Sequence, residues 1–465
     1  MKQKNSFSGQ IGFVFAAAGS AVGVGNLWRF PYLAAKDGGG LFLIIYLVLV
    51  LTVGFVLLTT DIAIGRKTGK SAIYAYESMR KKWKFLGVIT FLVPVLIMTY
   101  YAVIGGWILR YIVIYLTSSG KQAVADNCFT SFISSSSSVW YGLIFMFLTA
   151  LIVYNGVEKG IERVSKFIMP VLLLMVIGIA IFSLTLKTTL DDGTVRTGLQ
   201  GLKVYMMPDL TGITVSRFLQ ITLDAMSQLF FSLSVSMGIM ITYGSYVKKD
   251  VDLNKAVSQI EIMDTGVAFL AGIMIIPAVF VFSGLDGMSA GPGLMFVSLP
   301  KVFYSMGAVG RIIGILFFVL AGFAALTSCI SVLESITANC MELFHAERKK
   351  TTRVLSVIYL IATAVIALGY SIFYVEVQLP NGSTGQLLDI MDYISNSFMM
   401  PFISLLSAIL IGWVMKPSWI AEEMELNGEK FKRKKLYNVM ICYIMPVIMV
   451  ILFLQSTGVL NLFMK

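Results

Sequence analysis

Long apolar segments alternate with short polar segments along the whole chain. Many of the apolar segments reach the ~20 residues that a helix needs to cross ~30 Å of hydrocarbon. We expect each to be an α-helix, because a helix satisfies its own backbone hydrogen bonds in lipid. The pattern predicts eleven spans, at residues 10–34, 40–65, 86–117, 139–155, 161–186, 216–246, 257–284, 305–343, 353–373, 386–414 and 435–458.

Composition agrees with an all-α polytopic membrane protein. Of 465 residues, 57% are hydrophobic and 13% are charged, whereas soluble domains average about 25% charged residues. The first apolar segment contains Asn26 and Arg29 and continues into Pro31, unlike a cleavable signal peptide. We expect it to remain as the first span.

The formal charge of +11 is concentrated between the apolar segments. Basic residues gather in alternate loops, which is the positive-inside pattern of a multi-pass protein and not a nucleic-acid groove. This predicts a cell-membrane protein with a cytoplasmic N-terminus and, because the number of spans is odd, an extracellular C-terminus. The basic clusters are Arg66 to Lys70, Arg80 to Lys84, Lys248 and Lys249, Arg348 to Lys350, and Lys432 to Lys435.

Several loops are longer than turns. Residues 187–215 form a long outer segment, and residues 285–304 could fold back over an outer vestibule. The inner segment 416–435 has the pattern of a short amphipathic helix or of a solvated charged surface. The four cysteines and the single histidine, His345, suggest neither a disulfide framework nor a histidine-ligated metal site.

Spans 1 and 6 depart from the apolar pattern. Span 1 has Gly19, Gly23 and Gly25 shortly before Asn26, and span 6 contains the sequence SQLFFSLSVSMG. Small residues alone are also typical of close helix packing. Polar side chains at this depth are costly and usually functional, however, and irregular backbone survives in a membrane only where it lines a protein cavity.

The two irregular spans are five apart. A five-span unit that is copied once inserts upside down, and interrupted helices at matching places in two inverted halves indicate the midplane site of a secondary transporter. No phosphate-binding or protease motif competes with this interpretation, so we do not expect an enzyme.

Four stretches carry a resemblance to a known family. The sequence GSAVGVGNLWRFPYLAAKDGGG, from Gly19 to Gly40, closely resembles the first-span signature of the neurotransmitter:sodium symporter family. YYAVIGGW (Tyr100 to Trp107), QLFFSLSVSMG (Gln228 to Gly238) and AALTSCISVLE (Ala324 to Glu334) follow in family order. The resemblance covers nearly the whole chain and implies a LeuT-type fold of five plus five inverted spans and one extra span.

The implied organisation has four parts. Residues 1–186 would be the first repeat, 187–215 an extracellular loop, 216–414 the second repeat, and 415–465 a cytoplasmic loop followed by span 11.

The resemblance also implies two sodium sites. The first would use the Ala21 carbonyl with Asn26, Ser232 and Asp264, and the substrate carboxylate would complete it. The second would use the ligands Gly19, Val22, Ala324, Thr327 and Ser328. Both are oxygen cages suited to a hard cation. Taken without the family, Thr327 and Ser328 could also bond to their own helix.

For the substrate, the resemblance implies an amino acid with a free carboxylate. The N–H groups of Val24 and Gly25 and the Tyr101 hydroxyl would hold that carboxylate, and the pocket wall would carry no charge. An apolar or aromatic side chain is therefore favoured. The implied substrate-binding residues are Ala21, Val24, Gly25, Ile97, Tyr101, Phe231, Ser232, Ser234, Met237, Cys329 and Val332.

Implied gates lie on both sides of this pocket. Arg29 and Asp392 resemble the extracellular ion pair, and Lys4 and Glu342 occupy the positions of the cytoplasmic pair. Lysine lacks the bidentate fork of the arginine that the family favours at position 4. Glu334, on the helix of the second sodium site, could be a buried carboxyl hydrogen-bonded to span 1 or span 2.

Chloride is not expected as a co-ion. Tyr46, Gln228 and Ser232 resemble parts of the family's anion site, but Asp264 stands where chloride-dependent relatives have asparagine. A fixed carboxylate beside sodium would supply the negative charge; a hydrogen-bonded Asp264 without this role is the alternative. The sequence thus predicts a chloride-independent sodium symporter. A non-transporting amino-acid sensor of the same fold and a sodium channel remain open.

Overall fold

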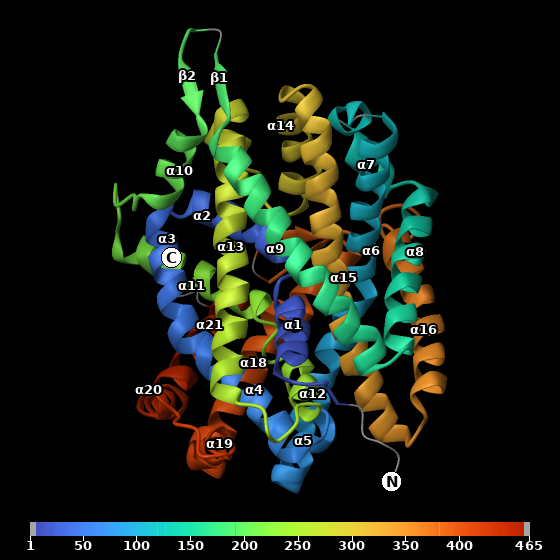
Figure 1. Cartoon of the computed structure of the whole chain (residues 1–465), viewed down its shortest axis with the longest axis vertical. Helices are drawn as coiled ribbons and strands as arrows, with labels where there is room; N and C mark the ends of the chain where they lie inside the picture. The colour runs from blue at the N-terminus through green and yellow to red at the C-terminus, as the bar shows by residue number, and fades with distance from the viewer. Residues whose placement is uncertain (1–5, 119, 126, 191, 381, 460–465) are drawn as a thin grey trace.

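The computed structural model describes residues 6–118, 120–125, 127–190, 192–380 and 382–459. Within this part of the chain the molecule is a bundle of long helices that run roughly parallel to its longest axis (Figure 1). We call the end that carries β1, β2 and α14 the upper face, and the opposite end, with α5 and α19, the lower face (Figure 1).

Nine helical stretches among the described residues are long and apolar enough to cross a membrane. A tenth span is the pair α1 (Gln10–Ala21) and α2 (Val24–Lys36), which is bent by 53°. The pair α11 (Val215–Ser232) and α12 (Ile239–Ser245) lies in the region of predicted span 6 and is interrupted at residues 233–238. The all-α fold and the breaks in spans 1 and 6 are thereby confirmed. The nine continuous stretches are Gly40–Thr68, Lys81–Ser118, Ser136–Tyr154, Val157–Leu184, Leu253–Ser283, Ala308–Phe344, Arg348–Leu368, Leu387–Met415 and Lys434–Ser456.

These stretches contain the remaining helices of the spans, several of them joined by π-helical turns. They are α3 (Gly40–Leu49), α4 (Phe55–Thr68), α6 (Lys84–Ser118), α8 (Ser136–Tyr154), α9 (Arg163–Leu184), α13 (Leu253–Ser283), α15 (Ala308–Phe344), α16 (Arg348–Leu368), α17 (Leu387–Asp392), α18 (Met400–Ile409), α20 (Lys434–Val439) and α21 (Met445–Ser456).

Short elements connect the spans. Strands β1 (Lys187–Thr189) and β2 (Val195–Thr197) pair antiparallel, with Lys187 opposite Thr197, and β3 (Val377–Gln378) pairs with β4 (Thr384–Gly385). The connecting helices are α5 (Ala72–Met79), α7 (Cys128–Ile133), α10 (Gly198–Met206), α14 (Leu299–Ser305) and α19 (Ser418–Met424).

Glycine permits the closest helix contacts. A Cβ atom on Gly106 of α6 would lie 2.5 Å from the Gly142 nitrogen of α8, and one on Gly65 of α4 would lie 1.9 Å from the Ile241 carbonyl oxygen of α12. Neither position accepts a larger residue without moving backbone. Small residues at such crossings are typical of membrane helices, where van der Waals packing drives association.

At the lower face, the segment 416–435 is tied to the bundle. Glu423 of α19 is 3% exposed and accepts hydrogen bonds from Arg66 of α4 (2.7 Å) and from Lys249 (2.9 Å). The segment does contain a helix, α19, but Glu423 lies in a buried ion pair and not on a solvated surface. The ion pair therefore joins the end of span 2 to the loops before spans 7 and 11.

Removing Glu423 should destabilise the fold, because Arg66, which is 2% exposed, would keep its charge without a carboxylate partner. We expect Glu423→Ala to cost about 3–5 kcal/mol. The matched control, Glu422→Ala, breaks an exposed pair with Lys67 and should cost at most about 1 kcal/mol. Denaturant titrations in mixed micelles measure both; equal losses would contradict a structural role for the buried pair.

Candidate functional site

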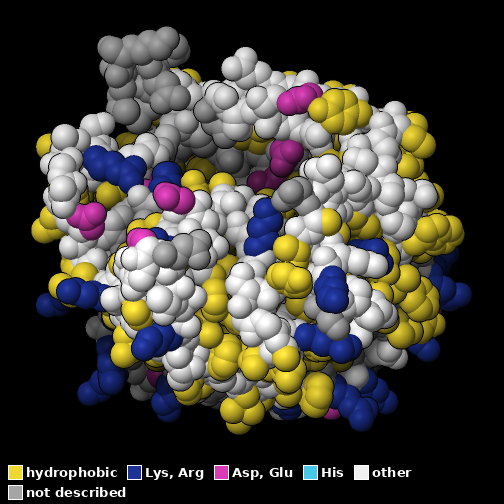
Figure 2. Space-filling model, turned by 90° about the horizontal axis from the view of Figure 1, so that it is seen from above, with side chains coloured by type: hydrophobic (Ala, Val, Ile, Leu, Met, Phe, Trp, Pro, Cys, Tyr) yellow, Lys and Arg dark blue, Asp and Glu magenta, His cyan; other side chains and the backbone are white. Residues whose placement is uncertain are grey.

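A cavity of about 680 Å³ lies between the upper halves of the spans. Figure 2, a view from above, shows the upper face hollowed, with hydrophobic and acidic side chains around the hollow. The walls of the cavity come from α2, α6, α11, the loop at 290–292, α17, α18 and α21. Part of the predicted outer segment 285–304 thus lines the cavity. Among the lining residues are Trp28, Arg29, Tyr101, Asp224, Ser227, Phe231, Ala290, Asp392 and Asn396.

Below this cavity the backbone of spans 1 and 6 is irregular. Span 1 leaves the helix at Val22 and Gly23. In span 6, Ser234 and Ser236 adopt φ angles of 52° and 61°, and Gly238 one of 74°. Residues other than glycine rarely occupy this left-handed region, and they stay there only where surrounding structure holds them.

Hydroxyl groups hold these breaks together. The Ser234 Oγ donates to the Ser20 carbonyl oxygen at 2.9 Å, and the Ser328 Oγ of α15 donates to the same oxygen at 3.1 Å. The Ser236 N–H donates to Asp61 Oδ2 at 2.8 Å, and the Ser236 Oγ accepts from Ser404 at 2.6 Å. Spans 1, 2, 6, 8 and 10 therefore meet through polar contacts at the level of the breaks.

The side chains predicted for the first sodium site are brought together. The Asn26 Nδ2 donates to Asp264 Oδ1 at 2.9 Å and to Ser232 Oγ at 3.0 Å. The Ser232 hydroxyl lies 2.9 Å from both Asp264 oxygens. All three side chains are almost fully buried. The arrangement concentrates oxygen atoms and one carboxylate beside the broken end of span 1, where a small cation could bind.

The residues predicted for the second sodium site lie where α1 and α15 approach each other. A Cβ atom on Gly19 would lie 3.3 Å from the Thr327 Cβ. The Thr327 hydroxyl donates within its own helix, to Phe323 and Ala324 carbonyls at 3.0 and 3.2 Å, which is the alternative that its sequence left open. The Ser328 hydroxyl reaches across to span 1.

Two predicted substrate residues, Tyr101 and Phe231, line the floor of the cavity. The Val24 N–H donates to the Tyr101 hydroxyl at 3.4 Å. A Cβ atom on Gly25 would lie 2.4 Å from the Phe231 ring, so this ring covers the start of α2. The other predicted substrate residues are buried and are not part of the cavity lining: Ala21, Val24, Gly25, Ile97, Ser232, Ser234, Met237, Cys329 and Val332.

The predicted upper gate residues face the same cavity and have other partners. Arg29 donates to Ser227 at 2.6 Å, whereas Asp392 accepts from Tyr100 at 2.8 Å and from Asn396 at 2.6 Å. Both are described residues, and no ion pair within 4.0 Å joins them. The cavity is therefore open between them.

At the mouth of the cavity, ion pairs tie α2 to α11. Lys36 lies 2.9 Å from Asp224, and Arg217 lies 2.9 Å from Asp37. Burial raises the pKa of Asp37 to about 6, and the nearby Asp224 adds to the shift. The upper halves of spans 1 and 6 are thus held to each other by charge.

At the lower end, Lys4 lies outside the described residues. Glu342 accepts hydrogen bonds from the N–H and the hydroxyl of Ser71, at 3.1 and 2.7 Å. Phe7 is buried against Tyr243 and Tyr246, with ring centroids 5.6 and 6.2 Å apart.

The expectation that Glu334 bonds to span 1 or span 2 is wrong. Glu334 accepts from Tyr246, next to α12, at 2.7 Å, and from Arg348 at the start of α16 at 2.6 Å. Arg348 follows Glu334 by fourteen residues in the sequence. The loop between α15 and α16 turns the chain back, so that the two side chains meet.

Sequence reasoning also missed Asp61. This carboxylate is 2% exposed on α4 and holds the Ser236 N–H in the break of span 6. The available signal was an acidic residue within an apolar span, because such a residue is costly in a membrane and usually functional.

Comparison with known proteins decides the family. The model of the "Sodium:neurotransmitter symporter family" matches residues 4–141 and 129–462. The chain belongs to this family. The symporter is 35% identical over 465 residues to the uncharacterised sodium-dependent transporter YhdH of Bacillus subtilis (strain 168), with 98% of each chain covered.

Two further comparisons place the symporter among its relatives. It is 24% identical to the sodium- and chloride-dependent GABA transporter 2 of Rattus norvegicus, covering 91% of this chain and 75% of that protein. The crystal structure of MhsT in complex with L-phenylalanine superimposes with a TM-score of 0.84 at 35% identity, covering 98% and 100% of the two chains. The symporter is therefore a multi-pass, sodium-dependent transporter with the LeuT-type fold, and not an enzyme.

Proposed function

We propose that the symporter imports a small apolar or aromatic amino acid together with two sodium ions, by alternating access and without chloride. The observation that carries this proposal is the cluster of Asn26, Ser232 and Asp264 beside the broken start of α2. A helix N-terminus attracts a carboxylate through its free N–H groups and its dipole. The same point thus offers sites for an anionic group and for a cation.

Substrate recognition would take place below Phe231. The carboxylate would bind the N–H groups of Val24 and Gly25 and the Tyr101 hydroxyl, in place of the present contact between Val24 and Tyr101. Ile97, Met237 and Val332 are buried and uncharged, which supports an apolar or aromatic side chain. MhsT, solved with L-phenylalanine, supports the same substrate class.

Sodium binding would replace hydrogen bonds that now hold the breaks. At the first site, the Asn26 amide now turns its nitrogen toward Asp264, so a cation would require the amide oxygen to turn inward. At the second, carbonyls of Gly19, Val22 and Ala324 would be joined by Thr327 and Ser328. Oxygen ligands of this kind suit a hard cation.

The gradient would suffice for concentrative uptake. Two charges that cross 100 mV release ~4.6 kcal/mol, and a tenfold sodium gradient adds ~1.4 kcal/mol for each ion. The inverted repeats would be residues 1–186 and 216–414, with loop 187–215 between them and 415–465 after them. The N-terminus would be cytoplasmic and the C-terminus extracellular, so the open cavity would face outward.

Uptake of labelled L-phenylalanine and L-leucine into proteoliposomes tests the proposal. We expect accumulation only with inward sodium. Binding that needs sodium but gives no accumulation would favour a sensor, and substrate-independent sodium conductance would favour a channel.

Amino acids should bind, whereas the corresponding amines should not. Family members for amines carry an aspartate at the position of Gly23 that replaces the missing carboxylate. Gly23 provides no such carboxylate, and even a Cβ there would crowd the Tyr101 hydroxyl, at 3.0 Å. Competition assays with leucine or tryptophan and the matching decarboxylated amine measure the difference; comparable affinities within a pair would refute it.

Thr327→Ala with Ser328→Ala should abolish concentrative uptake and weaken sodium binding, because two ligands of the second site are lost. Thr337→Ala serves as the control: this buried threonine lies on the same helix and bonds only to Leu333 at 2.8 Å. Sodium titrations followed by tryptophan fluorescence compare the variants. A double variant that titrates like the control would refute the assignment.

Transport should proceed at full rate in chloride-free buffer, because Asp264 supplies the negative charge. Asp264→Asn should lose most sodium affinity when chloride is replaced by gluconate, and added chloride should restore part of it. Wild-type protein in both buffers is the control. If the variant without chloride binds sodium as the wild type does, Asp264 is not the compensating charge.

A further inference from the structure

The basic segment at residues 430–435 has no role in the proposed transport site. Its sequence is KFKRKK, and it continues into α20 at the lower face. Phe431 anchors it: this ring is 5% exposed and lies 6.1 Å from Phe55 and 5.6 Å from Tyr437, measured between ring centroids. Its neighbours Lys430 and Lys432 are both exposed. The anchored aromatic residue thus holds two lysines at the surface.

Two of the cations in the segment are neutralised within the protein. Arg433 lies 2.7 Å from Glu261 and 3.5 Å above the Phe55 ring, and Lys434 lies 2.9 Å from Glu425. These pairs fix the segment against α13 and α19.

The other three cations are not neutralised. Lys430, Lys432 and Lys435 are exposed, and their side chains have no hydrogen bond or ion pair to any described residue. The adjacent carboxylate, Glu429, accepts hydrogen bonds from Asn427 instead. Three positive charges therefore remain without a partner on a segment that Phe431, Arg433 and Lys434 attach to the bundle.

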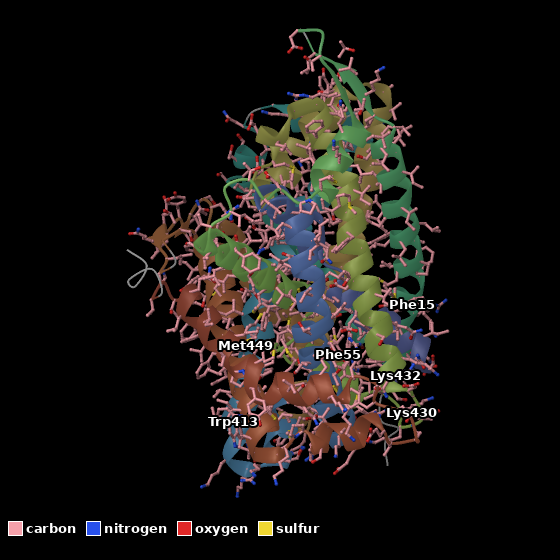
Figure 3. All side chains as sticks on the ribbon, turned by 90° about the vertical axis from the view of Figure 1, so that its left-hand side faces the viewer. Phe15, Phe55, Trp413, Lys430, Lys432 and Met449 are labelled. Carbon is pink, nitrogen blue, oxygen red and sulfur yellow. The ribbon has the colours of Figure 1, made fainter. Side chains whose placement is uncertain are left out.

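Exposed apolar side chains lie on α1 and α13, the two helices above these lysines. Figure 3 shows Lys430 and Lys432 at the lower end of α13, below Phe15 of α1. Ile262, the residue after Glu261, is 70% exposed, and Ile11 at the start of α1 is 65% exposed. Gln10 and Gln259 are hydrogen-bonded at 2.9 Å, which places α1 against α13 here. The lysines would lie at the level of a phospholipid headgroup, and the exposed apolar side chains above them at the level of its acyl chains.

We propose that Lys430, Lys432 and Lys435 bind the phosphate headgroup of an anionic phospholipid, whose acyl chains lie along the apolar surface of α1 and α13. A basic cluster directly before a membrane span attracts anionic lipids electrostatically. Here the cluster is also fixed to spans 2 and 7 through Phe431 and Arg433, which makes it a defined site. A zwitterionic lipid adds a positive choline group and binds less well.

The test is lipid binding to the full-length protein in detergent micelles, counted by native mass spectrometry during titration with phosphatidylglycerol or phosphatidylcholine. The test variant is Lys430→Gln, Lys432→Gln and Lys435→Gln together. The matched control is Arg80→Gln, Lys81→Gln and Lys82→Gln, which removes three charges from another exposed loop that enters a span.

We expect the wild type and the control to prefer phosphatidylglycerol, and the test variant to bind it on the order of 100-fold more weakly. The single variant Lys432→Gln should lie between them, which keeps the test usable if the triple variant unfolds. Equal losses in test and control variants would show diffuse attraction only and would overturn the site. Displacement of the lipid by millimolar inorganic phosphate would overturn the assignment to a lipid.

Discussion

The centre of this transporter depends on the hydrogen bonds that the carbonyl oxygen of Ser20 accepts. Span 1 leaves the helix just after this residue, so its carbonyl has no helical N–H partner. Hydroxyl groups of Ser234 from span 6 and Ser328 from span 8 supply hydrogen bonds in its place. An unpaired carbonyl within a membrane costs several kcal/mol, so the break in span 1 requires polar residues on two other spans.

The same requirement links structure to ion binding. Under the proposed function, hydroxyl and amide groups at the backbone breaks would also supply oxygen ligands to sodium. Asn26, Ser232 and Asp264 now bond to one another, and under this proposal a cation would replace those bonds. At the break in span 6, Asp61 satisfies the backbone by accepting a hydrogen bond from the Ser236 N–H in the left-handed turn. Under this proposal the backbone breaks and the ion sites are one feature of the fold.

Charges at the two ends of the molecule have different roles. At the upper face, Arg29 and Asp392 both line the cavity and have separate partners, and Phe231 belongs to the same lining. At the lower face, the partners of Glu334, Glu342 and Glu423 join helices that belong to different spans. Because Arg29 and Asp392 are not paired with each other while the contacts at the lower face are closed, the cavity is accessible from the upper face.

The sequence by itself determined the membrane class, the apolar spans and the two breaks, because hydrocarbon thickness and backbone hydrogen bonding impose these features locally. The motifs also identified the family, and that resemblance is the basis for proposing Asn26, Ser232 and Asp264 as sodium ligands. Tertiary structure decided which side chains meet: Arg348 with Glu334, Glu423 with Arg66, and Asp61 with the Ser236 N–H. These partners come from different elements of the chain, and Asp61 and Ser236 are 175 residues apart. Their contacts follow from the packing of helices, which no local pattern of residues specifies.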